Sequence, residues 1–435
     1  MAPLRVHAPV AAWGDAPVPR SRPGVVDSAT RLLRARFSGL DAALPVRLWD
    51  GTRLGLGANG ALPGPPPFTL VITRPSVAAA LVSGLGLPGL TEALLDGRLQ
   101  IEGDLDAALR LRGALATPPA PRPRPWGGRL SWWWRARPLR DTVPAAAGWP
   151  APSAPGRIAG GETASAFFGL WLEPQMLGSC ALFLGPDTGL AQAQQDQLEQ
   201  ICRRLALGPG CRLLDIGAGW GGLVLHAARH HGVQALGLTL DPGQWALANG
   251  RIALAGLGRR VRVELRDWRA LGETGAWDRI VSLGGPMPLG GIGGLLRTEA
   301  VAGPADLAQV QRLLAPGGLF LQHALTRPPA RPGSRIGGGV EGGGAGDAPG
   351  TLSRLQRDLG AAGLEVLDVQ ALRGHAVQTL RHWGQRLQAQ EAAARRCAGA
   401  RAVREWRLGM ALQALDLERG AAGLYQVLAA RPDAG

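Results

Sequence analysis

The sequence predicts an α/β fold in which a mainly parallel sheet follows a small α+β domain, and three observations support this prediction. Short apolar runs alternate with helical patterns over the carboxyl-terminal two thirds of the chain, as strands and crossover helices do. One of these runs, at 213–216, ends in a cluster of glycines and leads directly into a helix. A proline-rich stretch at 117–160 separates this region from a shorter mixture of strands and helices.

The amino-terminal part divides into a tail and a small domain. Residues 1–27 are rich in proline, alanine and arginine without periodicity, so we expect a disordered tail. Residues 28–116 have the patterns of a small α+β domain. Its expected elements are a hairpin that begins at 45–51, a strand at 68–73, and helices at 76–83 and 90–96.

Residues 117–160 predict a linker, because proline at this density prevents regular structure. Tryptophan is interleaved with arginine along it, most densely at Trp132–Trp134. Indole rings prefer the headgroup level of a membrane, where guanidinium groups meet lipid phosphate. The same tryptophans would also suit docking onto a neighbouring domain, and the sequence leaves both interpretations open.

The remaining residues, 161–435, have a steady α/β pattern. The expected strands, of which the last is antiparallel to the others, lie at 213–216, 233–240, 261–267, 277–283, 319–325, 364–372 and 423–428. The expected helices lie at 191–207, 241–257, 306–314 and 376–418. A glycine- and proline-rich insertion at 327–350 interrupts the pattern.

The charge of the chain bears on its partners. The formal net charge is +14, and every basic side chain is an arginine because the chain contains no lysine. The excess of positive charge has two interpretations. It reflects either a general composition rich in arginine, alanine and glycine, or a function in which the chain binds an acidic surface. Because no motif that reads nucleic acid is present, we expect a phospholipid membrane surface and no nucleic acid as partner. A homodimer is one expected form of assembly.

Cysteine and histidine usage gives no sign of a metal. The four cysteines form no C-x-x-C pair, which favours a reducing compartment over a zinc site or a disulfide framework. His226, His230 and His231 have metal-like spacing, but no acidic residue lies near them in the sequence. We therefore expect them on a solvated helix face, and no metal ion.

Membrane-spanning segments are not expected either. No run of about 18 apolar residues occurs, and charged and proline residues interrupt the amino-terminal apolar stretch. The expected location is cytoplasmic and peripheral at the inner membrane.

The glycine cluster after 213–216 indicates a Rossmann-like nucleotide site. Gly217, Gly219 and Gly222 satisfy the dinucleotide spacing G-x-G-x-x-G, but this is weak evidence in a chain with 65 glycines. Asp215 sits two residues before the first glycine, as in the first motif of S-adenosylmethionine (SAM) methyltransferases. This favours SAM over NAD, which remains the alternative.

Several segments in matching order make the chain resemble the cyclopropane-fatty-acyl-phospholipid synthase family of SAM-dependent methyltransferases. They are Leu90–Gly97, Ile101–Leu105, Leu170–Pro174, Ser179–Ala181, Asp215–Gly222, Leu238–Leu240 with Gln244, and Tyr425–Leu428. The resemblance implies a Rossmann-like SAM methyltransferase sheet preceded by a small α+β lipid-binding-like domain. It also implies transfer of a methylene or methyl group to the double bond of unsaturated phospholipid acyl chains.

The resemblance assigns a set of residues to SAM. The expected contacts are Ser179, Asp215, Gly217, Ala218, Gly219, Trp220, Gly221, Thr239, Gln244, Asp267 and Trp268. Thr239 and Gln244 match positions near the ribose, and Asp267 and Trp268 match positions at the adenine. Asp241 is an alternative ribose ligand, since it follows the glycines by about 20 residues. A helix N-cap is the competing role for Asp241, and we favour it.

The resemblance also implies a catalytic pair, Cys180 and His323, next to a bound bicarbonate that acts as base. Cys180 would otherwise be a small buried apolar residue. His323 lies near the end of an expected strand, at the sheet edge where ligands bind in such folds.

Other family positions are altered in this chain. The family's Glu-His pair falls on Met287-Pro288, and two of its tyrosines fall on Gly178 and Ala376. Its His-Tyr-Asp before the first helix falls on 160–162. Loss of a positioned base typically costs about 10²–10⁴-fold in rate. The second hypothesis is therefore a catalytically inactive lipid- or SAM-binding paralogue.

Overall fold

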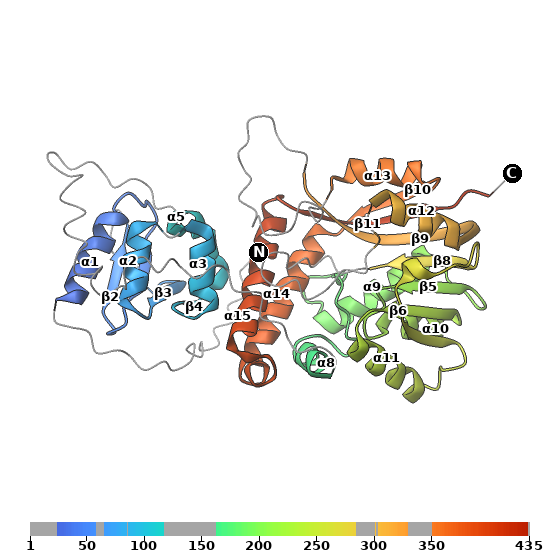
Figure 1. Ribbon diagram of the computed structural model, residues 1–435, viewed down its shortest axis with the longest axis horizontal. Helices are drawn as coiled ribbons and strands as arrows, with labels where there is room; N and C mark the ends of the chain where they lie inside the picture. Colours follow the sequence, from blue (N-terminus) through green and yellow to red (C-terminus); the bar gives the residue numbers. More distant parts are fainter. Residues whose placement is uncertain are drawn as a thin grey trace. The chain divides into compact units, whose positions relative to one another are not determined.

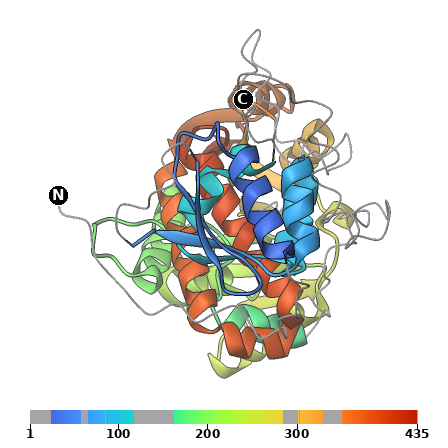
Figure 2. The ribbon, with the colours of Figure 1, turned by 90° about the vertical axis from the view of Figure 1, so that its left-hand side faces the viewer.

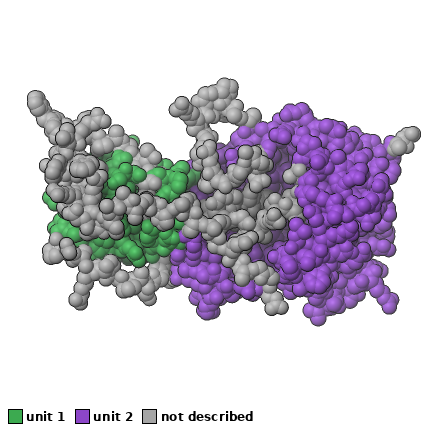
Figure 3. Space-filling view, viewed as in Figure 1, with its two compact units in different colours: residues 1–154 green, residues 155–435 purple. Residues whose placement is uncertain are grey.

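The computed structural model describes residues 24–57, 65–84, 86–116, 162–283, 301, 303–328 and 350–433. The chain divides into two compact units, residues 1–154 and 155–435 (Figure 3). Most of the expected tail, the linker and nearly all of the glycine-rich insertion lie outside the described residues. None of the described helices is long and apolar enough to span a bilayer.

The first unit is built on a four-stranded sheet in the order β2-β1-β3-β4. The strands are β1 (Leu44–Arg47), β2 (Arg53–Leu56), β3 (Phe68–Ile72) and β4 (Leu99–Gly103). The helices are α1 (Val25–Arg36), α2 (Pro75–Ser83), α3 (Gly86–Leu95), α4 (Leu105–Arg110) and α5 (Arg112–Ala116). The pair β1–β2 is the expected hairpin, and α1 lies beside α2 (Figure 2). Helix α1 begins at Val25, within the expected tail, because Ala29 and Leu33 bury its apolar side in the core.

The second unit contains a seven-stranded sheet in the order β10-β11-β9-β8-β5-β6-β7 (Figure 1). The strands are β5 (Arg212–Ile216), β6 (Gln234–Thr239), β7 (Val261–Leu265), β8 (Trp277–Ser282), β9 (Leu314–Thr326), β10 (Glu365–Ala371) and β11 (Gly423–Ala430). Every pair among β5 to β9 is parallel, whereas β11 is antiparallel to both β9 and β10. The α/β prediction and the antiparallel last strand are thus confirmed.

Helices cover both faces of this sheet (Figure 1). On one face pack α9 (Leu190–Arg204), α10 (Gly222–His231) and α11 (Pro242–Leu254), and on the other α12 (Gly303–Leu313) and α13 (Leu352–Ala361). Consecutive residues of β5 show this division, since Leu213 belongs to the first core and Leu214 to the second. Both faces of the strand are therefore buried, as in parallel sheets generally.

A third core joins α8 (Glu162–Gly169), α14 (Arg373–Ala389) and α15 (Glu391–Glu418) to the loop that follows β5. The sequence predicted one long helical region here. The structure has two helices, and α15 is itself interrupted at Gly399, whose φ of 82° and ψ of 158° are not helical. Trp220 of the glycine loop belongs to this core. These helices therefore pack against the carboxyl edge of the sheet, where the candidate site lies.

Candidate active site

The glycine turn follows β5 at the carboxyl edge of the sheet. Gly217, Gly219 and Gly221 have φ angles of 79°, 55° and 78°, a left-handed conformation that glycine adopts without steric cost. The amides of Gly217 and Ala218 donate to the carbonyl of Leu238 at 3.1 and 2.9 Å, which fixes the turn to β6. A Cβ added at Gly219 would meet no atom within 4 Å, so a ligand has room to approach this backbone.

The residues around the turn are closely packed. A Cβ added at Gly222 would lie 2.7 Å from the carbonyl oxygen of Gln175, so α10 begins against this backbone only because the residue is glycine. Asp215 is 2% exposed. The indole Nε1 of Trp220 donates to Ser165 Oγ at 2.9 Å, which ties the turn to α8.

The expected ribose residues come together at the end of β6. Thr239 Oγ1 donates to Gln244 Oε1 at 2.8 Å, so the two side chains form one polar group. Asp241 Oδ1 accepts from the Gln244 amide at 2.8 Å and caps α11. The structure therefore gives Asp241 the helix-capping role that the sequence favoured.

The expected adenine residues follow β7. Asp267 caps a short 3-10 helix over Trp268–Ala270 by accepting from the Arg269 amide at 3.0 Å, and its side chain is 44% exposed. The indole of Trp268 is only 1% exposed and packs in the core with Leu214 and Leu271. Asp267 is thus open to a ligand, whereas the Trp268 ring is enclosed by protein.

Ser179 and Cys180 lie in the segment between α8 and α9. Burial raises the pKa of the Cys180 thiol to about 12, so it is a neutral thiol at physiological pH. Its Sγ lies 4.0 Å from Thr379 Oγ1. Ser179 Oγ is buried without a hydrogen-bond partner, while the Ser179 carbonyl accepts from Gln194 Nε2 at 3.0 Å. Ser179 therefore retains an unused polar atom in the interior.

His323 lies on β9 in register with Gln426 of β11. Its Nε2 is 2.9 Å from Gln426 Nε2 and 3.4 Å from Gln197 Nε2, and its Nδ1 is buried without a partner in the described structure. Complete burial, reinforced by the charge of Arg204, lowers the pKa of His323 to about 3. The ring is therefore neutral at physiological pH.

The structure brings Cys180 and His323 to one region without direct contact. A small apolar pocket of about 10 Å³, room for roughly one water, is lined by Cys180, Leu325 and Leu424 among others. Leu325 and Leu424 face each other across β9 and β11, and His323 and Gln426 face each other two residues along. Because alternate residues of a strand share a face, His323 and Gln426 lie on the same face of the sheet as Leu325 and Leu424. The two pairs are two residues, or about 7 Å, apart along the strands.

Two of the altered family positions, Gly178 and Ala376, lie among the described residues. A Cβ added at Gly178 would meet no atom within 4 Å, so the room for a side chain is present there. Ala376 forms part of the pocket wall. Met287, Pro288 and residues 160–161 lie outside the described residues.

The sequence missed a chain of aromatic rings that joins the glycine turn to the pocket. Ring centroids are 5.1 Å apart between Trp220 and Phe168, 5.3 Å between Phe168 and Trp171, and 5.7 Å between Trp171 and Trp383. Trp383 lines the pocket together with Cys180. These residues come from α8, α14 and two loops, so only the tertiary structure shows that they are neighbours.

The prediction for the three histidines on α10 was wrong for His226. Its side chain is buried, and Nε2 lies 3.4 Å from Glu199 Oε2 on α9. His231 Nε2 lies 3.1 Å from the same oxygen. An acidic partner is therefore present, but it is about 27 positions away in the sequence, which is why local sequence inspection missed it. His230 is exposed, as expected.

Fold and site together define the class: a parallel sheet whose glycine turn, Thr239 and Asp267 gather at one edge is the SAM-dependent methyltransferase architecture. A family model described as mycolic acid cyclopropane synthetase matches residues 162–427. The chain belongs to this family and is a SAM-dependent methyltransferase, which confirms the resemblance drawn from the sequence motifs.

Relatives with established names agree with this assignment. A probable fatty acid methyltransferase of Pseudomonas putida is 32% identical, over 91% of this chain and 94% of its own length. The cyclopropane-fatty-acyl-phospholipid synthase of Escherichia coli (strain K12) is 38% identical, over 36% of this chain and 37% of its own. The crystal structure of mycolic acid cyclopropane synthase CmaA1 with SAH and CTAB is 26% identical, with a TM-score of 0.53, and covers 63% of this chain and 97% of that one.

Proposed function

We propose that this methyltransferase transfers a one-carbon unit from SAM to the double bond of an unsaturated acyl chain of a membrane phospholipid. The observation that carries the proposal is the ring series from Trp220 to Trp383, which extends from the glycine turn to an apolar pocket. Aromatic faces stabilise a cation and exclude water, the two requirements of a reaction that passes through a carbocation.

The residues at the carboxyl edge suit SAM. Gly219 leaves the backbone accessible, the Thr239–Gln244 pair offers polar atoms for a ribose, and Asp267 is exposed at the end of β7. Asp215 adds a buried carboxylate beneath the turn. When bound, SAM supplies an electrophilic methyl group.

The chemistry requires the alkene electron pair to form a carbon–carbon bond to this methyl as its bond to sulfur breaks. The resulting carbocation must then lose one proton. Among the described residues we assign the role of proton acceptor to His323, whose imidazole ring is neutral. As placed, the Gln426 amide nitrogen lies 2.9 Å from His323 Nε2 and donates to it, which leaves the ring proton on Nδ1. A 180° turn of the Gln426 amide puts its oxygen at this position, so that the proton moves to Nε2 and Nδ1 presents a free lone pair, the state that the proton-acceptor role requires. A weak base suffices because the carbocation is strongly acidic.

Bicarbonate, which the resemblance implied as base, fits this chain incompletely. Ser179 Oγ and His323 Nδ1 are buried polar atoms without partners, but His323 Nδ1 can donate to an anion only in the tautomer that carries its proton there, which excludes its role as proton acceptor. The family's glutamate and two tyrosines are replaced by Met287, Gly178 and Ala376. The proposed reaction therefore uses no bicarbonate. A relative named a probable fatty acid methyltransferase matches over 91% of this chain, and one named a tuberculostearic acid methyltransferase matches over 92%. Both names support methyl transfer without ring closure as the product-forming reaction.

A phospholipid surface is the partner that the proposed substrate requires. The net charge of +14 would attract the chain to acidic headgroups. We propose peripheral association at the inner membrane, no nucleic-acid partner, and a homodimer as the assembly to be checked. Co-sedimentation with acidic and neutral vesicles, with and without competing nucleic acid, tests the first two points, and sedimentation velocity tests the third.

Lipid mass spectrometry tests the reaction. The full chain, SAM and vesicles of monounsaturated phospholipid are incubated with and without bicarbonate, and a gain of one CH₂ per acyl chain is expected in both cases. Replacement of Trp383 by leucine should lower turnover far more than SAH affinity. The matched control is Trp245→Leu, since Trp245 is 43% exposed on α11 and should be tolerated.

The altered base positions favour the second candidate function, a non-catalytic lipid- or SAM-binding paralogue. SAH binding by calorimetry without any CH₂ gain would support it. The substitution Met287→Glu separates the two: increased turnover identifies a weakened enzyme, and no change supports the binding role.

A further inference from the structure

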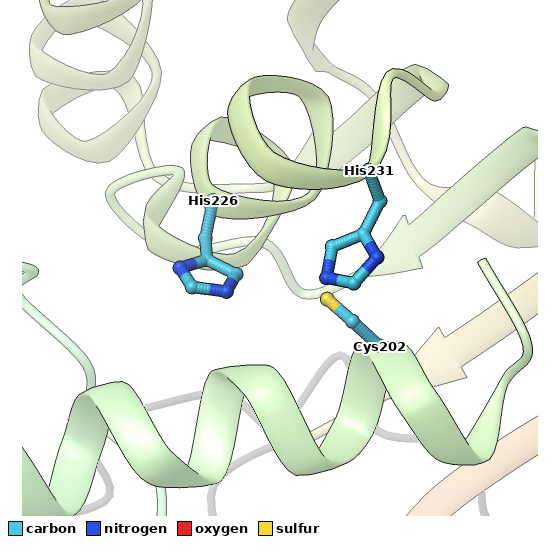
Figure 4. Close-up of side chains that lie close together, drawn as sticks. All are labelled: Cys202, His226 and His231. Atoms are coloured by element: carbon cyan, nitrogen blue, oxygen red, sulfur yellow. The ribbon is translucent and has the colours of Figure 1, made fainter. Parts of the chain in front are cut away.

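A cluster of metal-binding side chains lies between α9 and α10. Cys202 of α9 and His226 and His231 of α10 each present one ligand atom, and these three atoms lie within 4.8 Å of one another (Figure 4). Figure 4 shows the sulfur and the two rings directed into the same space between the helices. Glu199, one helical turn before Cys202, adds a carboxylate oxygen 3.4 Å from His226 Nε2 and 3.1 Å from His231 Nε2.

The donor set is that of a transition metal. One thiol, two imidazoles and one carboxylate are typical of zinc, which prefers four ligands in a tetrahedron. With metal–nitrogen bonds of about 2.0–2.1 Å and metal–sulfur bonds of about 2.3 Å, neighbouring ligand atoms lie roughly 3.3–3.6 Å apart. The two separations from Glu199 already have about this value. The ligand atoms of Cys202, His226 and His231 lie within 4.8 Å of one another, so they need to close by little more than an ångström at most.

The surroundings favour a cation. Both helices direct their carboxyl-terminal halves toward the cluster, since His231 is the last residue of α10 and Cys202 lies in the last turn of α9. The carboxyl end of a helix carries partial negative charge. Arg203 Nε donates to Glu199 Oε1 at 2.7 Å, which holds the carboxylate so that Oε2 faces the histidines.

Burial and access are also suitable. Cys202 is fully buried and the His226 side chain is 6% exposed, so these ligands are already fixed in the core. The side chains of His231 and Glu199 are 17% and 31% exposed, which opens the cluster to solvent on one side. An ion can therefore enter without unfolding the helices.

We propose that Cys202, His226, His231 and Glu199 form a structural binding site for a divalent transition metal of the zinc class, joining α9 to α10. The ion replaces the Cys202 thiol proton, which passes to solvent. The bound ion would cross-link the carboxyl-terminal end of α10, the helix that begins at the glycine turn, to α9. The proposal departs from the expectation of no metal ion, and it is independent of the acyl substrate.

Cobalt(II) is the probe for the test, because a tetrahedral cobalt–thiolate site has intense visible bands and a near-ultraviolet charge-transfer band. The full chain is purified, stripped with a chelator, kept reduced and titrated with Co²⁺, then with Zn²⁺ as competitor. The expected result is one equivalent of tetrahedral cobalt with thiolate charge transfer, displaced by zinc, together with a higher Tm. Octahedral spectra, or no saturable binding, would overturn the proposal.

Variants locate the site. Cys202→Ser should abolish the charge-transfer band, and His231→Ala should weaken affinity by about 100-fold or more. Cys397→Ser and His230→Asn are matched controls that should keep both, since neither residue belongs to the cluster. If Cys202→Ser fails to fold, His231→Ala, on the more exposed residue, decides the question. A band that persists in Cys202→Ser but disappears in Cys397→Ser would refute the assignment.

Discussion

The indole of Trp220 and the hydroxyl of Ser165 share a buried hydrogen bond of 2.9 Å that connects the glycine turn to α8. Both residues are at most 9% exposed, so water cannot replace the bond. The turn is therefore positioned by a helix some 55 residues earlier in the chain as well as by its own strands.

Removal of the Ser165 hydroxyl should weaken both folding and cofactor binding. Ser165→Ala leaves the Trp220 N–H buried and unsatisfied, which costs about 1–3 kcal/mol in the free energy of unfolding. Urea denaturation measures this loss, and calorimetry with SAH measures the weaker affinity. Ser83→Ala is the control, because the Ser83 hydroxyl is exposed on α2 and should contribute little. Equal effects in the two variants would contradict the positioning role of the buried bond.

A single methyl group at Gly222 should disrupt the start of α10. In Gly222→Ala the new Cβ would lie 2.7 Å from the Gln175 oxygen and 2.9 Å from Leu177 Cδ2, so backbone must move. Overpacking of this kind costs about 1–3 kcal/mol, and SAH affinity should fall with it. Gly250→Ala is the matched control, since that exposed glycine inside α11 has no atom near an added Cβ. Gly250→Ala should leave SAH binding unchanged and raise the free energy of unfolding by up to about 1 kcal/mol. If Gly222→Ala kept the stability and SAH affinity of the wild type, the close contact would be relieved without energetic cost, contrary to the prediction.

The buried His323 should make the protein acid-labile. Its pKa is lowered to about 3 in the folded protein, whereas an unfolded histidine titrates near 6.5. Below pH 6.5 the unfolded chain binds the proton and the folded chain does not, so stability falls as the pH drops toward 3. The loss is about 1.4 kcal/mol per pH unit, or roughly 2 kcal/mol between pH 6.5 and 5. Unfolding free energies measured against pH should show this slope, and His323→Gln should flatten it; an unchanged slope in the variant would assign the acid lability elsewhere.

The cysteines should differ sharply in alkylation. Burial raises the pKa of Cys180 and of Cys202 to about 12, and both thiols are enclosed in the core. Cys211 and Cys397 are only partly buried. Iodoacetamide at neutral pH with a chelator present should therefore label the second pair first, as read by peptide mass spectrometry. Rapid native labelling of Cys180 would show that its pocket opens in solution.

The elements of the fold could be predicted because their signals are local. The run at 213–216 and the glycines after it specify a strand and a turn within a dozen residues, and the structure has both. Asp241 at the head of α11 is an equally local capping signal. What the sequence could not give is proximity between distant segments. Glu199 and His226, or Trp220 and Trp383, become neighbours only through the packing of separate helices, which no local pattern specifies. The break at Gly399 was missed because helical composition continues on both sides of it.

The position of β11 has a consequence for synthesis. It follows every other strand of the described residues in sequence, yet it pairs with β9 on one side and β10 on the other. As the nascent chain emerges from the ribosome, β10 has no neighbour to join until residues 423–430 have been translated, and His323 lacks Gln426 until then. A chain that stops short of this strand would leave two sheet edges open to aggregation and would lack part of the candidate active site. Premature stop codons even near residue 420 should therefore behave as null alleles.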